Sequence, residues 1–168
     1  LTFSAHPLSV LNPLKEPARL ATVEQKEEYI RSVGIDGLIM LPMTQELLNQ
    51  SPEDFCTCLI KYLAPSEIVV GTNFTYGKKA AGNTETLVQS MGDAHIPVSV
   101  LDLVEAPQSD YPVSSTVIRG LIAEGKMQAA MALLGRPFEL RAEVVSGDRR
   151  GRTIGFPTAN MLIPPKAA

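Results

Sequence analysis

The sequence has no tryptophan and only two cysteines among its 168 residues. These cysteines, Cys56 and Cys58, do not form a C-x-x-C pair, and on a helix their side chains would point about 200° apart. A disulfide framework, a C-x-x-C redox motif and a cysteine-based metal site are therefore not expected. We predict two reduced thiols in a cytoplasmic protein.

Three further absences narrow the class of protein. No apolar run approaches the length that crosses a bilayer, and no segment resembles a signal peptide. The net charge is −3, so the sequence lacks the basic excess of a nucleic-acid-binding surface. It also begins with Leu1 inside an apolar stretch, and we expect a fragment of a longer protein. The remaining balance of 45% hydrophobic and 20% charged residues is that of a soluble globular protein.

The first two-thirds of the sequence alternates short apolar runs with helical patterns. Thr22 followed by Gln25 is typical of a capping box, and Ser51 followed by Pro52 is typical of a helix start. The expected strands are 1–3, 38–41, 68–70 and 98–104, and the expected helices are about 22–33, 51–63, 84–91, 115–124 and 127–134. This alternation predicts an α/β fold with a parallel sheet wrapped by helices.

The pattern changes after Gly135. Phe138, Leu140, Ala142 and Val144 alternate with charged residues, which predicts a half-buried antiparallel strand. We place a domain boundary near 135–137 and predict domains at 1–135 and 136–168.

Three hydroxyl residues stand where one of the expected helices begins. Ser114, Ser115 and Thr116 precede Arg119, which lies four residues after Ser115 and so shares its helix face. Backbone N–H groups, hydroxyl donors and a guanidinium together suit phosphate binding. The alternative is ordinary helix capping, for which serine and threonine are also favoured.

Two segments at strand ends carry candidate ligand contacts. In the segment 71–77, Asn73 offers an amide, while Phe74 and Tyr76 offer flat apolar surface, unless these aromatic rings fold back into the core. Phe3 and His6 follow the first expected strand. His6 is a candidate for ligand contact or proton transfer, although a lone histidine beside proline is more often structural.

The segment 151–160 combines glycines with oxygen donors. Gly155 and its neighbouring glycines would let the backbone approach phosphates, and the side-chain oxygens of Thr158 and Asn160 suit Mg²⁺. The arginines just upstream are candidates for attracting a polyphosphate, or belong to a solvated loop; they are Arg149, Arg150 and Arg152.

Taken in this order, the motifs resemble the bacterial bifunctional riboflavin kinase/FAD synthetase family. The resemblance runs from Phe3 and His6 through 73–77 and 114–119, across 134–137, and into 155–160. It implies a Rossmann-like nucleotidyltransferase sheet with helices on both faces, followed by the first strands of a β-barrel riboflavin kinase domain. It also implies two reactions, ATP-dependent phosphorylation of riboflavin to FMN and adenylylation of FMN to FAD with release of pyrophosphate.

The resemblance also assigns roles to the candidate residues. Ser115, Thr116 and Arg119, with Ser114, would hold ATP phosphates and stabilise the departing pyrophosphate. The flavin side would be formed by Phe3, His6, Asn73, Phe74 and Tyr76. In the kinase part, Gly155, Thr158 and Asn160 would contact Mg²⁺-ATP. The partners implied are small molecules, namely ATP, FMN and riboflavin.

Two parts of the family pattern are absent from this sequence. The upstream strand with its G-x-F-D-G-x-H-x-G-H motif would precede Leu1, and the rest of the kinase barrel with its catalytic acidic residue would follow Ala168. We therefore expect this chain alone to be inactive in both reactions. Two alternatives remain open, a nucleotidyltransferase acting on another phosphorylated acceptor and a catalytically silent flavin-binding homologue.

Overall fold

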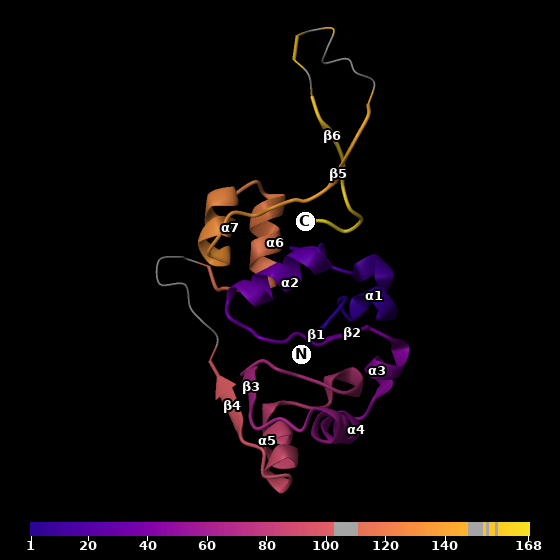
Figure 1. The fold of residues 1–168 in the computed structure, drawn as a ribbon, viewed down its shortest axis with the longest axis vertical. Helices are drawn as coiled ribbons and strands as arrows, with labels where there is room; N and C mark the ends of the chain where they lie inside the picture. Colours follow the sequence, from indigo (N-terminus) through magenta and orange to yellow (C-terminus); the bar gives the residue numbers. More distant parts are fainter. Residues whose placement is uncertain (103–110, 148–152, 154, 157) are drawn as a thin grey trace. The chain divides into compact units, whose positions relative to one another are not determined.

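The structure is a computed structural model that describes residues 1–102, 111–147, 153, 155, 156 and 158–168 (Figure 1). The chain forms two compact units, and each unit is built from two separate stretches of sequence. The first unit comprises residues 1–16 and 40–105, and the second comprises residues 17–39 and 106–168. Each unit gathers the residues that contact one another most, and neither unit ends at the domain boundary predicted near 135–137.

The first unit contains two pairs of parallel strands. Strand β1 (Thr2–Phe3) pairs with β2 (Met40–Leu41), and β3 (Ile68–Gly71) pairs with β4 (Val98–Leu101). These strands confirm the four sequence-predicted ones, although β2 is shorter than expected and residues 103 and 104 lie outside the described residues. Within the described part of the chain no further strand joins either pair, so the two pairs are separate small sheets.

Helices α3, α4 and α5 of the first unit begin at local capping signals. Ser51 accepts a hydrogen bond from the Asp54 N–H at the start of α4, and Asn83 accepts one from Thr86 at the start of α5. The helical segments are α1 (Leu8–Leu11), η1 (Pro13–Lys15), α3 (Gln45–Asn49), α4 (Pro52–Cys58), the π-helical η2 (Leu59–Leu63), η3 (Lys78–Ala80) and α5 (Thr84–Asp93). The short helices α1 and α3 were not expected from the sequence.

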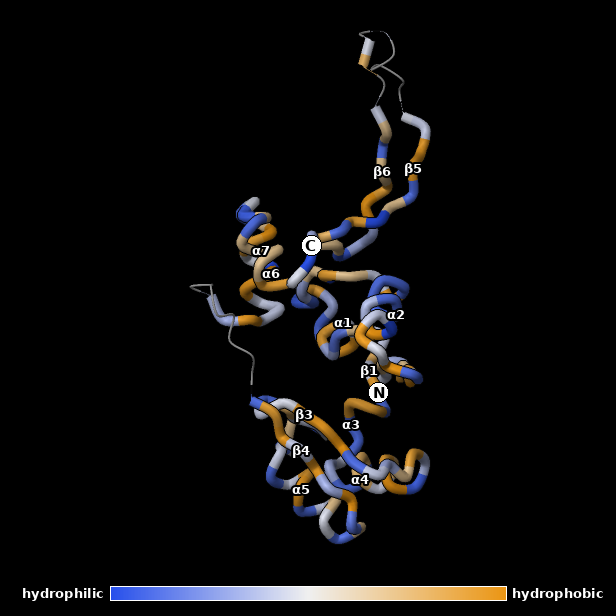
Figure 2. The backbone as a smooth tube through the Cα atoms, turned by 60° about the vertical axis from the view of Figure 1, so that its left-hand side comes forward, coloured by the Kyte–Doolittle hydropathy of each residue, from blue (hydrophilic) through white to orange (hydrophobic). Residues whose placement is uncertain are grey.

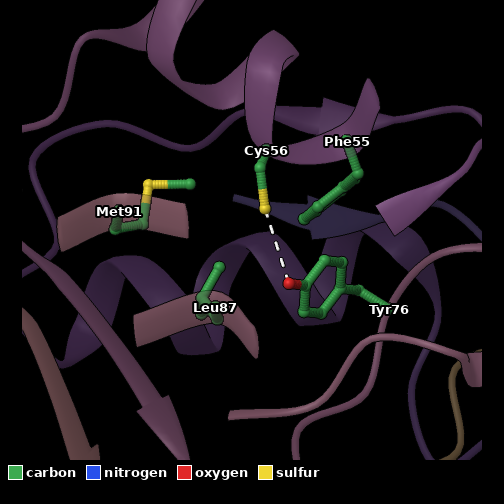
Figure 3. Packing of buried hydrophobic residues seen from close by; sticks show 5 residues of the cluster. All are labelled: Phe55, Cys56, Tyr76, Leu87 and Met91. Atoms are coloured by element: carbon green, nitrogen blue, oxygen red, sulfur yellow. Dashed lines mark hydrogen bonds between the residues drawn. The ribbon is translucent and has the colours of Figure 1, made fainter. Parts of the chain in front are cut away.

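The core of the first unit lies between α4, α5 and the loop that follows β3. Its buried side chains are Phe55, Cys56, Tyr76, Leu87 and Met91 (Figure 3). Ile68 and Val70 of β3 pack against this cluster, which explains the hydrophobic run along that strand (Figure 2). Cys56 and Cys58 are free thiols, as predicted.

The second unit is mainly helical. Helix α2 (Val23–Ser32) begins with the predicted capping box between Thr22 and Gln25, and α6 (Ser115–Ala123) and α7 (Met127–Leu134) each lead into a glycine with positive φ. Helices α6 and α7 share a core, whose buried members are Ile118, Leu121, Ala130 and Leu133. A hairpin of β5 (Glu143–Val145) and β6 (Asn160–Leu162) completes the described residues of this unit.

The strand predicted over 138–144 is wrong for most of its length, because β5 begins only at Glu143. The preceding residues instead follow α2. The Glu139 carbonyl accepts a hydrogen bond from the buried Gln25 side chain, Arg141 pairs with Glu28 at 2.7 Å, and the Arg136 guanidinium lies over the Tyr29 ring. These contacts with a helix take the place of pairing with another strand.

Among the described residues, no helix combines the length and the apolar character needed to cross a membrane. The units together form a mixed α/β structure of short parallel sheets and helices.

Candidate functional site

A cavity of about 450 Å³ opens in the first unit, beside the core cluster. Four aromatic rings line it: Phe3 from β1, Phe55 from α4, and Phe74 and Tyr76 from the loop after β3. The Phe74 and Tyr76 rings are stacked, with centroids 5.6 Å apart. The cavity therefore offers flat, apolar walls of the kind that hold a planar aromatic ligand.

Tyr76 belongs to both the core and the cavity wall. Its ring is buried, and its hydroxyl accepts a hydrogen bond from the Cys56 thiol at 3.5 Å (Figure 3). The same hydroxyl oxygen lies 3.1 Å from the Thr86 hydroxyl oxygen. Burial, together with the bond from Cys56, raises the pKa of Tyr76 to about 12. The hydroxyl is thus held by the protein itself, and it is the ring of Tyr76 that faces the cavity.

Backbone contacts fix the loop that carries these aromatic residues. Tyr76 and Gly82 exchange two hydrogen bonds, of 3.0 and 2.9 Å, and the Lys78 N–H donates to the Gln50 carbonyl at 2.7 Å. Gly77 has a φ of +73° and packs against Pro52 so closely that a Cβ there would come within 2.9 Å of the proline ring. The cavity wall is therefore held in place before any ligand binds.

Two of the predicted flavin-contacting residues do not line the cavity. Asn73 is exposed and does not line the cavity, whereas its neighbours Phe74 and Thr75 do. His6 is also exposed, and its Nδ1 accepts a hydrogen bond from the Leu8 N–H at 3.1 Å, at the start of α1. This contact is the structural role that was considered for His6.

Several residues of the cavity were not predicted from the sequence. Met43, Leu47 and Leu48 supply aliphatic walls, and Lys78 and Lys79 supply positive charge. A signal for the lysines was present, since they directly follow Gly77 in the aromatic loop. The aliphatic residues lie near α3, a helix that the sequence patterns did not reveal.

The hydroxyl cluster lies in the second unit, at the start of α6. Ser114 is the N-cap and accepts a hydrogen bond from the Val117 N–H at 3.2 Å, while Ser115 and Thr116 are exposed in the first turn. Arg119 is half-buried, and its Nε donates to the Ala18 carbonyl. One of the five N–H donors of Arg119 is thus used to position the side chain.

The third group of candidates lies on or near the β5–β6 hairpin. Gly155 has a φ of +80°, and Thr158 and Asn160 are exposed. The Asn160 amide lies against Gly147, where a Cβ would overlap it. Arg149, Arg150 and Arg152 lie outside the described residues.

Two protein-family models match this chain over separate ranges. The family model described as FAD synthetase matches residues 1–117, and the model described as riboflavin kinase matches residues 134–168. This chain belongs to the FAD synthetase family. The FAD synthetase range contains the aromatic loop and the three hydroxyl residues Ser114, Ser115 and Thr116, and the riboflavin kinase range contains the whole β5–β6 hairpin.

Curated relatives carry the name of a bifunctional member of the FAD synthetase family. The proteins named bifunctional riboflavin kinase/FMN adenylyltransferase from Listeria monocytogenes and Bacillus subtilis are each 35% identical to this chain, over 97% and 98% of its length. The Escherichia coli K12 protein of the same name is 30% identical over 96% of the chain. The alignments span 51%, 54% and 51% of these relatives, so the chain spans about half their length.

A solved structure shares the fold over nearly the whole chain. The crystal structure described as a macrolide-efflux protein from Streptococcus pneumoniae superposes with a TM-score of 0.80 at 28% identity, covering 99% of this chain and 53% of that one. Its description differs from those of the curated FAD synthetase relatives, although the fold is shared.

Proposed function

We propose that this chain forms the flavin-binding part of an FMN adenylyltransferase, within a parent protein that also phosphorylates riboflavin. The observation that carries the proposal is the aromatic cavity of the first unit, which lies entirely inside the FAD synthetase match. Phe3, Phe74 and Tyr76 would hold the isoalloxazine ring by apolar and stacking contacts. Asn73 and His6 would contact the flavin from outside the cavity lining.

The nucleotide would be held at the start of α6. The exposed hydroxyls of Ser115 and Thr116, with Ser114 and Arg119, would bind the ATP phosphates and stabilise charge on the departing pyrophosphate. Attack of the FMN phosphate on the α-phosphorus of ATP needs no covalent enzyme intermediate, so these residues would act by positioning and electrostatics. The anchoring of Arg119 by Ala18 supports this role, because a held guanidinium loses less freedom on binding.

The domain division that we propose is adenylyltransferase at 1–135 and the start of riboflavin kinase at 136–168. It is supported by the two family matches, which end at residue 117 and begin at residue 134. In the parent, the two small parallel sheets would be parts of one Rossmann-like sheet with helices on both faces. The β5–β6 hairpin would be the first part of a kinase β-barrel.

Thr158 and Asn160 fit a Mg²⁺ site in the kinase part. Both side chains are exposed and carry oxygen donors, which suit Mg²⁺. The ion would be bound together with ATP, where it neutralises phosphate charge, and Gly155 would let the backbone approach those phosphates. We place both activities in the cytoplasm, in keeping with the free thiols of Cys56 and Cys58.

Titration of flavin fluorescence with this chain tests the proposal. We expect saturable binding of FMN, weakened about tenfold by Phe74→Ala, because a stacked ring contributes roughly 1 to 2 kcal/mol. Tyr62→Ala is the matched control, since Tyr62 is an exposed aromatic residue of the same unit that does not line the cavity. Absence of FMN binding, or an equal effect of both substitutions, would overturn the assignment of the cavity.

The titration separates one of the remaining candidates, and an assay of FAD formation by the parent protein separates the other. A silent flavin-binding homologue would bind FMN, but its parent would not form FAD from ATP and FMN. A nucleotidyltransferase for another acceptor would not bind FMN. For the chain itself we expect neither reaction, and FAD formation at the rate of an intact relative would contradict that expectation.

A further inference from the structure

The cavity of the first unit contains positive charge without a matching negative charge. Lys78 and Lys79 are the charged residues among those that line it, and both are exposed, so they lie where the cavity meets solvent. In the described part of the chain, neither lysine forms an ion pair. Two lysines therefore line an apolar aromatic pocket, and no carboxylate among the described residues pairs with them.

The backbone that presents these lysines is unusual. Gly77, Lys79 and Ala80 have φ values of +73°, +57° and +55°, so three of four consecutive residues are in the left-handed region. A residue with a side chain pays roughly 1 kcal/mol or more there, and such conformations are concentrated at ligand-binding sites. The paired hydrogen bonds between Tyr76 and Gly82 hold this conformation in place.

We infer that Lys78 and Lys79 bind the phosphate of a phosphorylated flavin and give the cavity its preference for FMN over riboflavin. This inference rests on the proposed function of the cavity. The aromatic walls match the ring that both flavins share, whereas the lysines match the one group by which they differ. A phosphate carries close to two negative charges near neutral pH, and lysine binds it as a point charge.

The test compares the two flavins in one assay. We expect FMN to bind about tenfold more tightly than riboflavin, which is the value of one charge-assisted contact. We expect the double variant K78Q/K79Q to lose this preference, so that FMN and riboflavin bind with similar affinity.

Two controls keep the result specific to charge at this site. Lys61→Gln removes one positive charge from the same unit, at an exposed lysine that lies over the Tyr62 ring and away from the cavity, and should leave the preference intact. The variant K78R/K79R keeps the charge and should retain the preference. Raising the salt concentration should reduce it for the wild-type chain.

The outcomes distinguish the inference from the proposed function. If neither flavin binds, the flavin cavity itself is wrong and the inference falls with it. If both bind and K78Q/K79Q leaves their ratio unchanged, only the inference is overturned. If the double variant instead loses binding of inorganic pyrophosphate while keeping its preference for FMN, the lysines serve the nucleotide, which also overturns the inference.

Discussion

The ring of Tyr76 lies directly over the α-carbon of Gly82, so that a Cβ at position 82 would come within 2.6 Å of the ring. The two residues also exchange backbone hydrogen bonds. The loop can close in this way only because residue 82 has no side chain.

We therefore expect Gly82→Ala to destabilise the protein by about 2 kcal/mol, because the buried ring must move. The same substitution should weaken FMN binding, since Tyr76 is part of the cavity wall. Urea unfolding followed by circular dichroism measures the first effect. Gly92→Ala is the control: Gly92 lies in α5 with open space around it, and alanine there should stabilise by roughly 0.5–1 kcal/mol. Equal effects at both positions would contradict the packing argument.

The Tyr76 hydroxyl should make stability depend on pH in the alkaline range. Its pKa is raised from 10.0 to about 12, so the unfolded chain releases this proton at a lower pH than the folded chain. Tyr76 therefore contributes stability that is fully present below pH 10 and is lost as the pH rises through 12. Tyr76→Phe should flatten the decline in unfolding free energy over this range.

The exposed Tyr62 provides the comparison for that experiment, because Tyr62→Phe should leave the alkaline decline unchanged. At neutral pH, Tyr76→Phe should also cost about 1 kcal/mol through the lost hydroxyl contacts with Cys56 and Thr86. A wild-type slope in Tyr76→Phe would show that the phenol is not the titrating group.

Arg141 should control the acidity of Glu28. The hydrogen bond from Arg141 holds the pKa of Glu28 below its usual value, and this contribution to stability is lost as the pH falls through the lowered pKa. Arg141→Met should return the Glu28 pKa towards the ordinary value, as measured by NMR titration of the carboxylate. Glu24 is an internal control, because its pKa is lowered by its own backbone N–H and by Thr22, not by Arg141. A joint shift of both residues would indicate a general change in the helix.

Replacing Ala64 with glycine should increase the stability of the protein. It caps η2 with a φ of 42°, in the left-handed region that glycine prefers. We expect Ala64→Gly to stabilise by roughly 0.5–1 kcal/mol in thermal or urea unfolding. Ala94→Gly is the control, because Ala94 caps α5 with a φ of −93°. This substitution should slightly lower stability. If both variants lose stability, the conformation at residue 64 differs from the one described.

Gly147 should determine where the Asn160 amide points. A Cβ at position 147 would overlap that amide, which is the movable end of a side chain, so Gly147→Ala should redirect Asn160 without disrupting the hairpin. The NMR resonances of the Asn160 side-chain amide should shift, while the backbone signals of β5 and β6 change little. Gly37→Ala, at a glycine with no neighbour within 4 Å, should leave them unchanged.

Much of the secondary structure could be predicted because it depends on neighbours in sequence. The hydroxyl or amide of a capping residue bonds to the backbone three residues later, and Thr22, Ser51 and Ser114 all do so. The strand predicted over 138–144 was wrong as far as residue 142. Alternation of apolar and charged residues indicates which side chains are half-buried, but not which part of the protein buries them. There the burying partner is α2, more than a hundred residues away.

The candidate site was predicted in part for the same reason. Motif order pointed to the aromatic loop, but whether Tyr76 served the core or a ligand depended on Cys56, Thr86 and Gly82, which it meets only in the folded unit. Lys78 and Lys79 were not predicted although they directly follow Gly77, because it is the closure of the loop, with a positive φ at Lys79, that brings them to the cavity. Asn73 was expected beside its aromatic neighbours, and the turn after β3 instead leaves it exposed.

Gln25 and the Glu139 carbonyl are joined by a hydrogen bond although 114 residues separate them. During synthesis, α2 therefore leaves the ribosome long before the segment that accepts the hydrogen bond from its buried Gln25 amide. This contact can form only after the residues between them have been made. A chain ended at residue 135, the domain end that we propose, would lack this hydrogen-bond partner. Expression trials of that domain should extend past Arg141, even though the added residues belong by descent to its neighbour.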